Sequence, residues 1–243
     1  MLRCILLFAL ISISSLISAQ SYNWGIKGGL TLGKQRGAYS PSVLFKFHGD
    51  LFLESYSEED RTNLGVQLGY HPRGSAIRSW GFSNGTSGSV VSFTNNFLYN
   101  NAVLAPYAKQ KFKLNDKFKG YYSLGFRLEY TFGSNLPSGN DFNNNVIYYY
   151  YPIKENIRKW NYGPMLAAGI QLQYSELVDG FIEFNFSPDL SSQYYQLPLQ
   201  NVRSFDPYTG VVQNISLPEQ SNKNLSFEIT LGFRFLRKIE YID

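Results

Sequence analysis

The sequence predicts an all-β protein: an eight-stranded antiparallel up-and-down transmembrane β-barrel with short periplasmic turns and long extracellular loops. Three observations predict this fold class. Eight segments alternate apolar and polar residues with a period of two. The connections between them are alternately long and short. Aromatic residues make up 17% of the chain, with 19 Tyr and 19 Phe against 2 Met, which is typical of many strands with polar loops.

The N-terminus predicts a targeting segment that is separate from the barrel. Arg3 precedes an apolar run over 5–17, and Ser18-Ala19-Gln20 offers small residues for cleavage after Ala19. A membrane-anchoring helix is the alternative, but the run is shorter than the roughly 20 apolar residues that a span requires. We therefore expect a signal peptide over 1–19, one barrel domain over 20–243, and export to the outer membrane of a Gram-negative bacterium.

Cysteine content and charge exclude several classes of function. The only cysteine, Cys4, lies in the predicted signal peptide, so the mature chain can form no disulfide, thiolate metal site or cysteine nucleophile. The net charge of +4 is weak and dispersed, which argues against nucleic acid as a partner.

The predicted strands follow one another along the whole mature chain. They lie at residues 22–32, 43–54, 64–71, 97–112, 122–132, 162–174, 182–187 and 225–235. The fourth segment is apolar, but its phase is ambiguous. The sixth alternates clearly except that Met165 and Ala167 fall on its polar side, and the eighth alternates most regularly.

The connections differ in length in a regular order. They cover residues 33–42, 57–62, 72–96, 114–120, 134–159, 175–180 and 188–223, and run long, short, long, short, long, short, long. In an up-and-down barrel, successive connections lie at opposite ends. Short turns at one end and long loops at the other are typical of transmembrane barrels, whereas a soluble sandwich has no reason to sort its loops in this way.

The chemistry of the two alternating sets indicates which face is wet. In a soluble barrel such as a lipocalin the apolar set would point inward, and in a membrane barrel it would point outward to lipid. The polar set holds many glycines and charges of both signs, which can neutralise one another in a crowded interior, while aromatic residues gather near the segment ends as in interfacial girdles. We predict a lumenal charge network of Lys27, Lys46, His48, Asp50, Glu54, Arg127, Glu129, Glu183, Glu228 and Arg234.

Three strand motifs resemble a known family. WGIKGGL at 24–30, LGYHPRGS at 68–75 and ITLGFRF at 229–235 are similar to the PorT-like outer-membrane β-barrel domains of Bacteroidetes, and the resemblance covers nearly all of the mature chain. It implies an eight-stranded barrel in the outer membrane with both termini in the periplasm. It does not imply the role of PorT itself in protein secretion.

The sequence supports catalysis and metal binding poorly. His48 and Asp50 share one face of a strand, but residues two apart in a strand are separated by nearly 7 Å, and no nucleophile motif accompanies them. His71 falls near the loop end of the third strand, with Ser75 and Ser79 nearby. The chain has only two histidines and no acidic repeat with calcium-loop spacing. We therefore predict no catalytic residue, metal or cofactor.

Tyrosines in the long loops form a possible contact surface for an envelope protein or a glycan. They are Tyr148, Tyr149, Tyr150, Tyr151, Tyr194, Tyr195 and Tyr208. Alternatively, these loops extend the hairpins above the membrane and their tyrosines pack on one another.

The leading functional hypothesis is a non-enzymatic scaffold or loop-mediated binding module, with outer-membrane lipid as its first partner. A narrow diffusion channel and a loop-sited lipid or glycan hydrolase are the alternatives.

Overall fold

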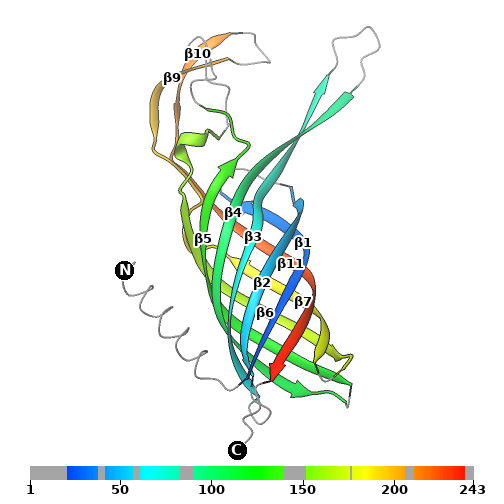
Figure 1. The fold of residues 1–243 in the computed structure, drawn as a ribbon. Helices are drawn as coiled ribbons and strands as arrows, with labels where there is room; N and C mark the ends of the chain where they lie inside the picture. Colours follow the sequence, from blue (N-terminus) through cyan, green and yellow to red (C-terminus); the bar gives the residue numbers. More distant parts are fainter. Residues whose placement is uncertain are drawn as a thin grey trace, which may run out of the picture.

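The computed structural model describes residues 21–37, 42–56, 61–82, 90–115, 117–138, 152–175, 177–205 and 211–238. In this part of the chain, eight long strands form a ring in the order β1-β2-β3-β4-β5-β6-β7-β11, and the β1–β11 pairing closes it (Figure 1). All neighbouring strands are antiparallel. The predicted up-and-down barrel is confirmed. The predicted signal peptide over 1–19 lies outside the described residues.

The barrel strands are long and several extend beyond the wall. Their bounds are β1 Ser21–Arg36, β2 Leu44–Tyr56, β3 Thr62–Phe82, β4 Val90–Lys113, β5 Phe118–Ser134, β6 Trp160–Gln173, β7 Val178–Pro188 and β11 Gln220–Lys238. The remaining elements are η2 Lys154–Asn156, β8 Tyr194–Gln196, β9 Leu199–Phe205 and β10 Val212–Leu217. Among the described residues, no helix is long and apolar enough to cross a membrane.

The two ends of the barrel differ, as the connection lengths predict. At the short-turn end, Ser21 of β1 pairs with Lys238 of β11, and brief turns join β2 to β3, β4 to β5 and β6 to β7. Side chains close two of these turns: Asn115 Oδ1 accepts hydrogen bonds from the backbone N–H of Lys117 and Phe118, and Ser175 Oγ does the same for the β6–β7 turn. At the long-loop end, the β3–β4 and β9–β10 hairpins project from the barrel (Figure 1).

The long-loop end contains more strand than the sequence predicts. Residues 72–96 were expected to form a loop, but the β3–β4 ladder continues from the pair Pro72–Asn100 up to Phe82–Val90. Pro72 fits within β3 because the β2–β3 pairing ends at Tyr70, so the missing N–H breaks no bond to β2. The expected loop over 188–223 likewise contains β8, β9 and β10. Period-two patterning misses these parts because neither face is uniformly apolar above the barrel wall.

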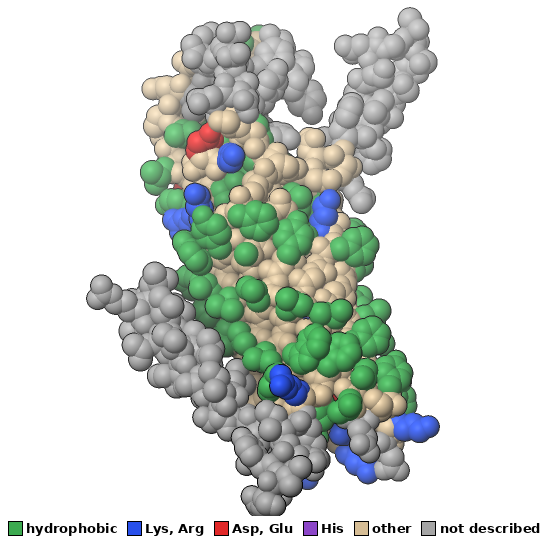
Figure 2. Space-filling model, in the orientation of Figure 1, with side chains coloured by type: hydrophobic (Ala, Val, Ile, Leu, Met, Phe, Trp, Pro, Cys, Tyr) green, Lys and Arg blue, Asp and Glu red, His purple; other side chains and the backbone are tan. Residues whose placement is uncertain are grey.

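The two faces of the wall have opposite chemistry. In every barrel strand except β4, whose phase the sequence leaves open, the predicted polar set faces the interior and the predicted apolar set faces outward. Phe47 is 76% exposed and Leu124 is 60% exposed, whereas Glu54 and Glu129 are fully buried. Figure 2 shows hydrophobic side chains over the middle of the wall, with Lys and Arg side chains towards its two ends.

The structure resolves the phase of β4. Its odd-numbered residues from Phe97 to Lys109 face the interior and are buried, and Leu104 and Phe112 face outward. The phase is unreadable from the sequence because both faces are apolar. Val103, Ala105 and Tyr107 form an interior cluster with Met165 of β6, which accounts for the break in alternation at that residue.

Interior glycines make room for large interior side chains. A Cβ added at Gly65 would lie 2.5 Å from Cζ of Tyr107 on the neighbouring β4. The absence of that side chain lets the Tyr107 ring lie flat across β3 and reach Glu54 on β2. Glycine in the polar set therefore serves the crowded interior that the composition predicts.

Candidate functional site

The most distinctive chemistry of the molecule lies inside the barrel, where charged side chains from almost every strand meet in layers. Four such layers follow one another from the short-turn end to the long-loop end. In the first layer Glu54 of β2 accepts a hydrogen bond from the Tyr107 hydroxyl at 2.8 Å and pairs with Lys109 of β4. The Arg234 guanidinium of β11 lies 3.6 Å from the same carboxylate and also pairs with Asp179 of β7.

The second layer joins strands that are next-but-one neighbours in the ring. Lys27 Nζ of β1 donates to Glu183 Oε1 of β7 at 2.7 Å, and the Tyr121 hydroxyl of β5 donates to the other oxygen at 3.0 Å. Lys27 and Glu183 are 156 residues apart in the sequence. Their pairing passes over the intervening strand β11 and therefore ties two non-adjacent strands together.

The third layer contains both histidines. His71 lies between two carboxylates, with Nε2 2.8 Å from Asp50 Oδ1 and Nδ1 2.9 Å from Glu228 Oε1. His48 stacks on His71 and makes hydrogen bonds to two threonine hydroxyls, Thr31 and Thr230, both at 2.9 Å. Every ring nitrogen of the two histidines is thus engaged by the barrel itself.

Two arginines form the fourth layer. Arg73 Nε of β3 and Arg127 Nε of β5 lie 2.7 Å and 2.8 Å from the same Glu129 oxygen. Arg127 also pairs with Asp189, and Arg73 lies 3.6 Å from Glu228 in the layer below. All of these side chains are at most 1% exposed.

Neutral polar residues close the interior towards the long-loop end. Asp189 accepts hydrogen bonds from the backbone and side chain of Asn224 at 3.0 Å and 2.9 Å. Gln193 then links Asn224 to Thr131, with distances of 2.9 Å and 2.7 Å. The buried charges are thus separated from the long-loop end by a hydrogen-bonded layer.

This arrangement fills the barrel with fixed, mutually neutralising charge. A buried ion is tolerated only when an opposite charge and hydrogen bonds replace its hydration. An eight-stranded barrel is just wide enough for side chains to fill it. The interior can therefore hold the wall together, but it offers little free volume for a solute.

The structure brings together most of the predicted charge network. Lys27, His48, Asp50, Glu54, Arg127, Glu129, Glu183, Glu228 and Arg234 lie within these four layers. Lys46 differs, because it is half-buried and has no ion-pair partner among the described residues.

Five members of the network were not predicted from the sequence. They are His71, Arg73, Lys109, Asp179 and Asp189. His71 was expected near a loop, but it lies within the barrel because β3 continues to Phe82. Arg73 follows His71 by two residues, so continuing the alternation of the third strand by one step would have placed Arg73 in the interior. Lys109 could not be assigned to the interior from the sequence, because the pattern of β4 does not show which of its residues face inward.

The hydrolase alternative places its chemistry in a loop, near His71. In the structure, His71 lies in the barrel interior instead. His71 and Ser75 are each 2% exposed, and the Ser75 hydroxyl donates to Gln35 Oε1 at 3.0 Å. Within the described ranges, no group of three or more His, Cys, Asp or Glu side chains could hold a metal ion.

The tyrosines of the predicted contact surface do not all lie in the same environment. Tyr194 is fully buried, in a cluster with Phe97, Tyr99 and Leu136, so its assignment to an exposed surface was wrong. Burial also raises the pKa of its phenol, which accepts a hydrogen bond from Asn156. Tyr195 is half-exposed beneath the Arg158 guanidinium, 4.4 Å from the ring centroid. The structure does not describe the other five tyrosines of this set, which are Tyr148, Tyr149, Tyr150, Tyr151 and Tyr208.

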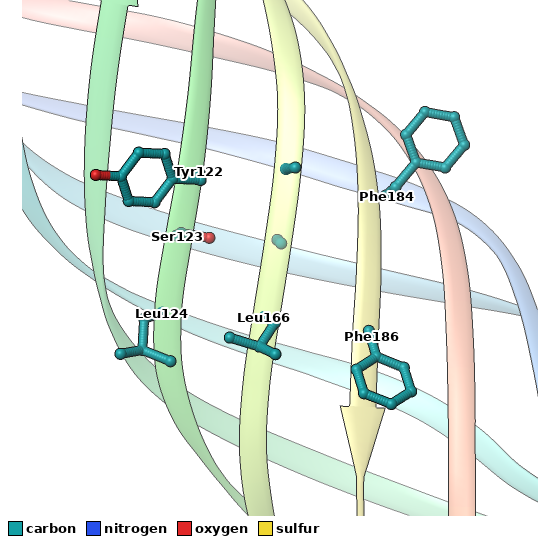
Figure 3. Close-up of a pocket in the computed structure, with 8 residues that line it drawn as sticks. Tyr122, Ser123, Leu124, Leu166, Phe184 and Phe186 are labelled. Atoms are coloured by element: carbon teal, nitrogen blue, oxygen red, sulfur yellow. The ribbon is translucent and has the colours of Figure 1, made fainter.

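Two apolar hollows lie on the outer wall. One of about 470 Å³ lies over β5, β6 and β7, where small Ala168 stands between the larger side chains of Tyr122 and Phe184 (Figure 3). A second, of about 960 Å³, lies nearer the short-turn end and is lined by residues such as Phe112, Ile170 and Phe233. Hollows of this kind suit flexible hydrocarbon chains.

No protein-family model and no curated protein sequence matches this chain. Among solved structures, it is similar to Neisserial surface protein A at 10% identity and a TM-score of 0.45, over 89% of this chain and 97% of that chain. The N-terminal β-barrel domain of Pseudomonas aeruginosa OprF follows at 9% identity and 0.43, over 90% and 98%. The outer membrane protease OmpT of Escherichia coli has 9% identity and 0.41, over 90% and 98%. These TM-scores are below 0.5, and the fold assignment rests on the strand pairing described above.

Proposed function

We propose that this chain is a non-enzymatic outer-membrane protein whose closed barrel spans the bilayer and presents the long-loop end as a scaffold or binding surface. One observation carries this proposal: the barrel is polar inside and apolar outside.

The exposed apolar surface supports a lipid environment for the wall. Exposed large apolar side chains occur on all eight barrel strands, for example Phe47, Leu68, Leu124, Phe184 and Leu231. A soluble monomer rarely exposes a contiguous apolar patch of more than a few hundred Å². In hydrocarbon, by contrast, such a wall is favourable, and the strands close into a ring through the β1–β11 pairing.

The loop lengths support one orientation. Transmembrane barrels generally keep short turns and both termini in the periplasm and send long loops outward. The short-turn end, where Ser21 pairs with Lys238, is therefore assigned to the periplasm. The resemblance to PorT-like barrels implies the same orientation, and that family assignment stays a prediction.

The filled interior and the projecting hairpins support a scaffold or binding role. Ion pairs occupy the lumen at four levels, which opposes the free diffusion of solutes. The hairpin β9–β10 and its flanks expose Leu197, Leu199, Val211 and Val212 at the long-loop end. Exposed apolar residues among neutral polar ones form a surface that suits contact with another envelope molecule.

Single cysteines test the location and orientation directly, because the predicted mature chain contains none. Gln213→Cys places a thiol on exposed β10, and Lys117→Cys places one in the exposed β4–β5 turn. In intact cells, a membrane-impermeant maleimide should label the Gln213→Cys variant and leave the Lys117→Cys variant unlabelled until the outer membrane is permeabilised. Labelling in the reverse order, or recovery of the protein in the soluble periplasmic fraction, would refute the proposal.

A further inference from the structure

Three cations gather on the outer face of the barrel at the long-loop end of the β1–β11 seam. Arg36 of β1 and Lys223 of β11 are directly opposite each other in the ladder, and Lys34 stands two residues before Arg36 on the same face. All three are exposed. Directly opposed residues in adjacent strands have Cβ atoms about 5 Å apart, and residues two apart in one strand are separated by about 7 Å.

Neighbouring interior residues determine the outward direction of this cluster. Gln35 and Asn224 alternate with the three cations along β1 and β11, and both are buried. Gln35 Nε2 donates to Asn224 Oδ1 at 3.2 Å, and Asn224 is held in turn by Asp189. Because successive side chains of a strand point to opposite faces, these interior bonds keep the three cations on the outer wall.

The cluster has no internal counter-charge. Among the described residues, Lys34, Arg36 and Lys223 form no ion pair. Asp189, which holds the neighbouring Asn224, points into the lumen and pairs with Arg127. Like charges opposite one another in a sheet are destabilising, so the arrangement favours a bound anion.

The wall immediately below the cations is apolar. Leu32 precedes Lys34 by one outward step and is flanked across the strands by Phe45, 58% exposed, and Phe227, 51% exposed. Leu225 also faces outward and stands directly opposite Lys34, while Arg36 and Lys223 lie one outward step, about 7 Å, further along. The cations therefore lie at and just above the edge of the apolar wall, at the depth of lipid headgroups.

We propose that Lys34, Arg36 and Lys223 bind the phosphate groups of a phosphorylated glycolipid in the outer leaflet, whose acyl chains pack on the apolar wall below. A phosphate monoester carries more charge than a carboxylate and offers three acceptor oxygens. Arg36 can contact it through two parallel N–H groups, while the two lysines contribute point charges. This inference rests on the proposed membrane location and on the orientation that places the long loops outside.

The test compares lipid retention by the folded full-length mature barrel. Wild-type protein in phosphatidylcholine nanodiscs containing a small fraction of bisphosphorylated lipid A is analysed by native mass spectrometry, beside nanodiscs containing the same lipid without its phosphates. We expect the phosphorylated form to be retained preferentially. The variant K34Q/R36Q/K223Q should reduce that preference roughly tenfold or more, since three charge-assisted contacts are lost.

A matched control removes three exposed cations from the opposite end. R61Q/K117Q/K119Q has the same net charge as the test variant, and its three positions lie in or beside the short turns. This control should retain the preference, and K34R/K223R should retain it too. Equal loss in the control and test variants would attribute the effect to net charge and overturn the assignment.

Three further outcomes are decisive. Equal retention by wild type and K34Q/R36Q/K223Q overturns the site. Equal retention of phosphatidylglycerol, or displacement of lipid A by millimolar inorganic phosphate, overturns the assignment to a glycolipid. The cysteine-labelling experiment separates these failures from failure of the proposed function, since correct labelling of the Gln213→Cys variant without lipid preference contradicts only this inference.

Discussion

The imidazole rings of His48 and His71 stack inside the barrel, with centroids 5.0 Å apart and planes at 20°. The two residues come from adjacent strands, and each ring is fixed by a separate pair of partners: threonine hydroxyls for His48 and carboxylates for His71. Both histidines of the chain are thus part of one interior structure. Substitutions at these interior positions therefore test how much the interior contacts stabilise the barrel.

Replacing His71 with alanine should destabilise the barrel strongly. The change leaves Asp50 and Glu228 facing one another in a buried space, and removal of one partner from a buried ionic group costs about 3–5 kcal/mol. The free energy of unfolding in urea, measured in lipid vesicles, checks this value. Gln213→Ala, at an exposed position, serves as the control. A loss of less than about 1 kcal/mol would show that the two carboxylates find other partners.

An arginine on the outer wall should discriminate a membrane barrel from a soluble one. Leu124 is 60% exposed in the middle of β5, and Leu124→Arg should cost about 2–4 kcal/mol when the protein folds into vesicles. Gln213→Arg above the wall should have almost no effect. If Leu124→Arg leaves the folding free energy in vesicles unchanged, that position does not face hydrocarbon.

The filled interior predicts that the wild-type barrel conducts no steady ionic current in planar bilayers. Glu129→Ala removes the carboxylate that Arg73 and Arg127 share, so both guanidinium groups lose a partner and the layer should open. Single-channel recording should therefore detect openings in the variant at a frequency well above wild type. Stable conductance of the wild-type protein would favour the narrow-channel alternative instead.

Lys27 and Glu183 should behave as a coupled pair across the intervening strand β11. Lys27→Met alone leaves Glu183 with only the Tyr121 hydroxyl, whereas in a Glu183→Gln background the same change removes no charge pair. A double-mutant cycle on unfolding free energies should give a coupling of about 1–3 kcal/mol. Additive single effects would mean that the 2.7 Å contact contributes no net stability.

Glycine at position 65 should be required by the ring of Tyr107. Gly65→Ala introduces a Cβ within 2.5 Å of that ring, and the ring cannot withdraw without losing its hydrogen bond to Glu54. We expect a cost of about 1–3 kcal/mol, typical of overpacking, in the same unfolding measurement. Gly65→Ala/Tyr107→Ala, which removes the ring, should recover part of the loss.

Much of the barrel wall could be predicted from the sequence because a strand has a strict period. Alternate residues such as Trp24 and Ile26 must share one face, and Gly25 and Lys27 the other. The alternation gives no answer where residues on both faces of a strand are apolar. In β4 both Val103 and Leu104 are apolar, so only the position of β4 between β3 and β5 reveals that Val103 faces inward.

The sequence by itself determined the number of barrel strands, the sorting of short and long connections, and the face on which most charges lie. The tertiary structure alone decided which charges meet, as in the contact of Lys27 with Glu183 across 156 residues. The physical reason is that alternation sets the direction of a side chain but not its height in the barrel. Height depends on strand register and on the stagger at which β1 closes against β11.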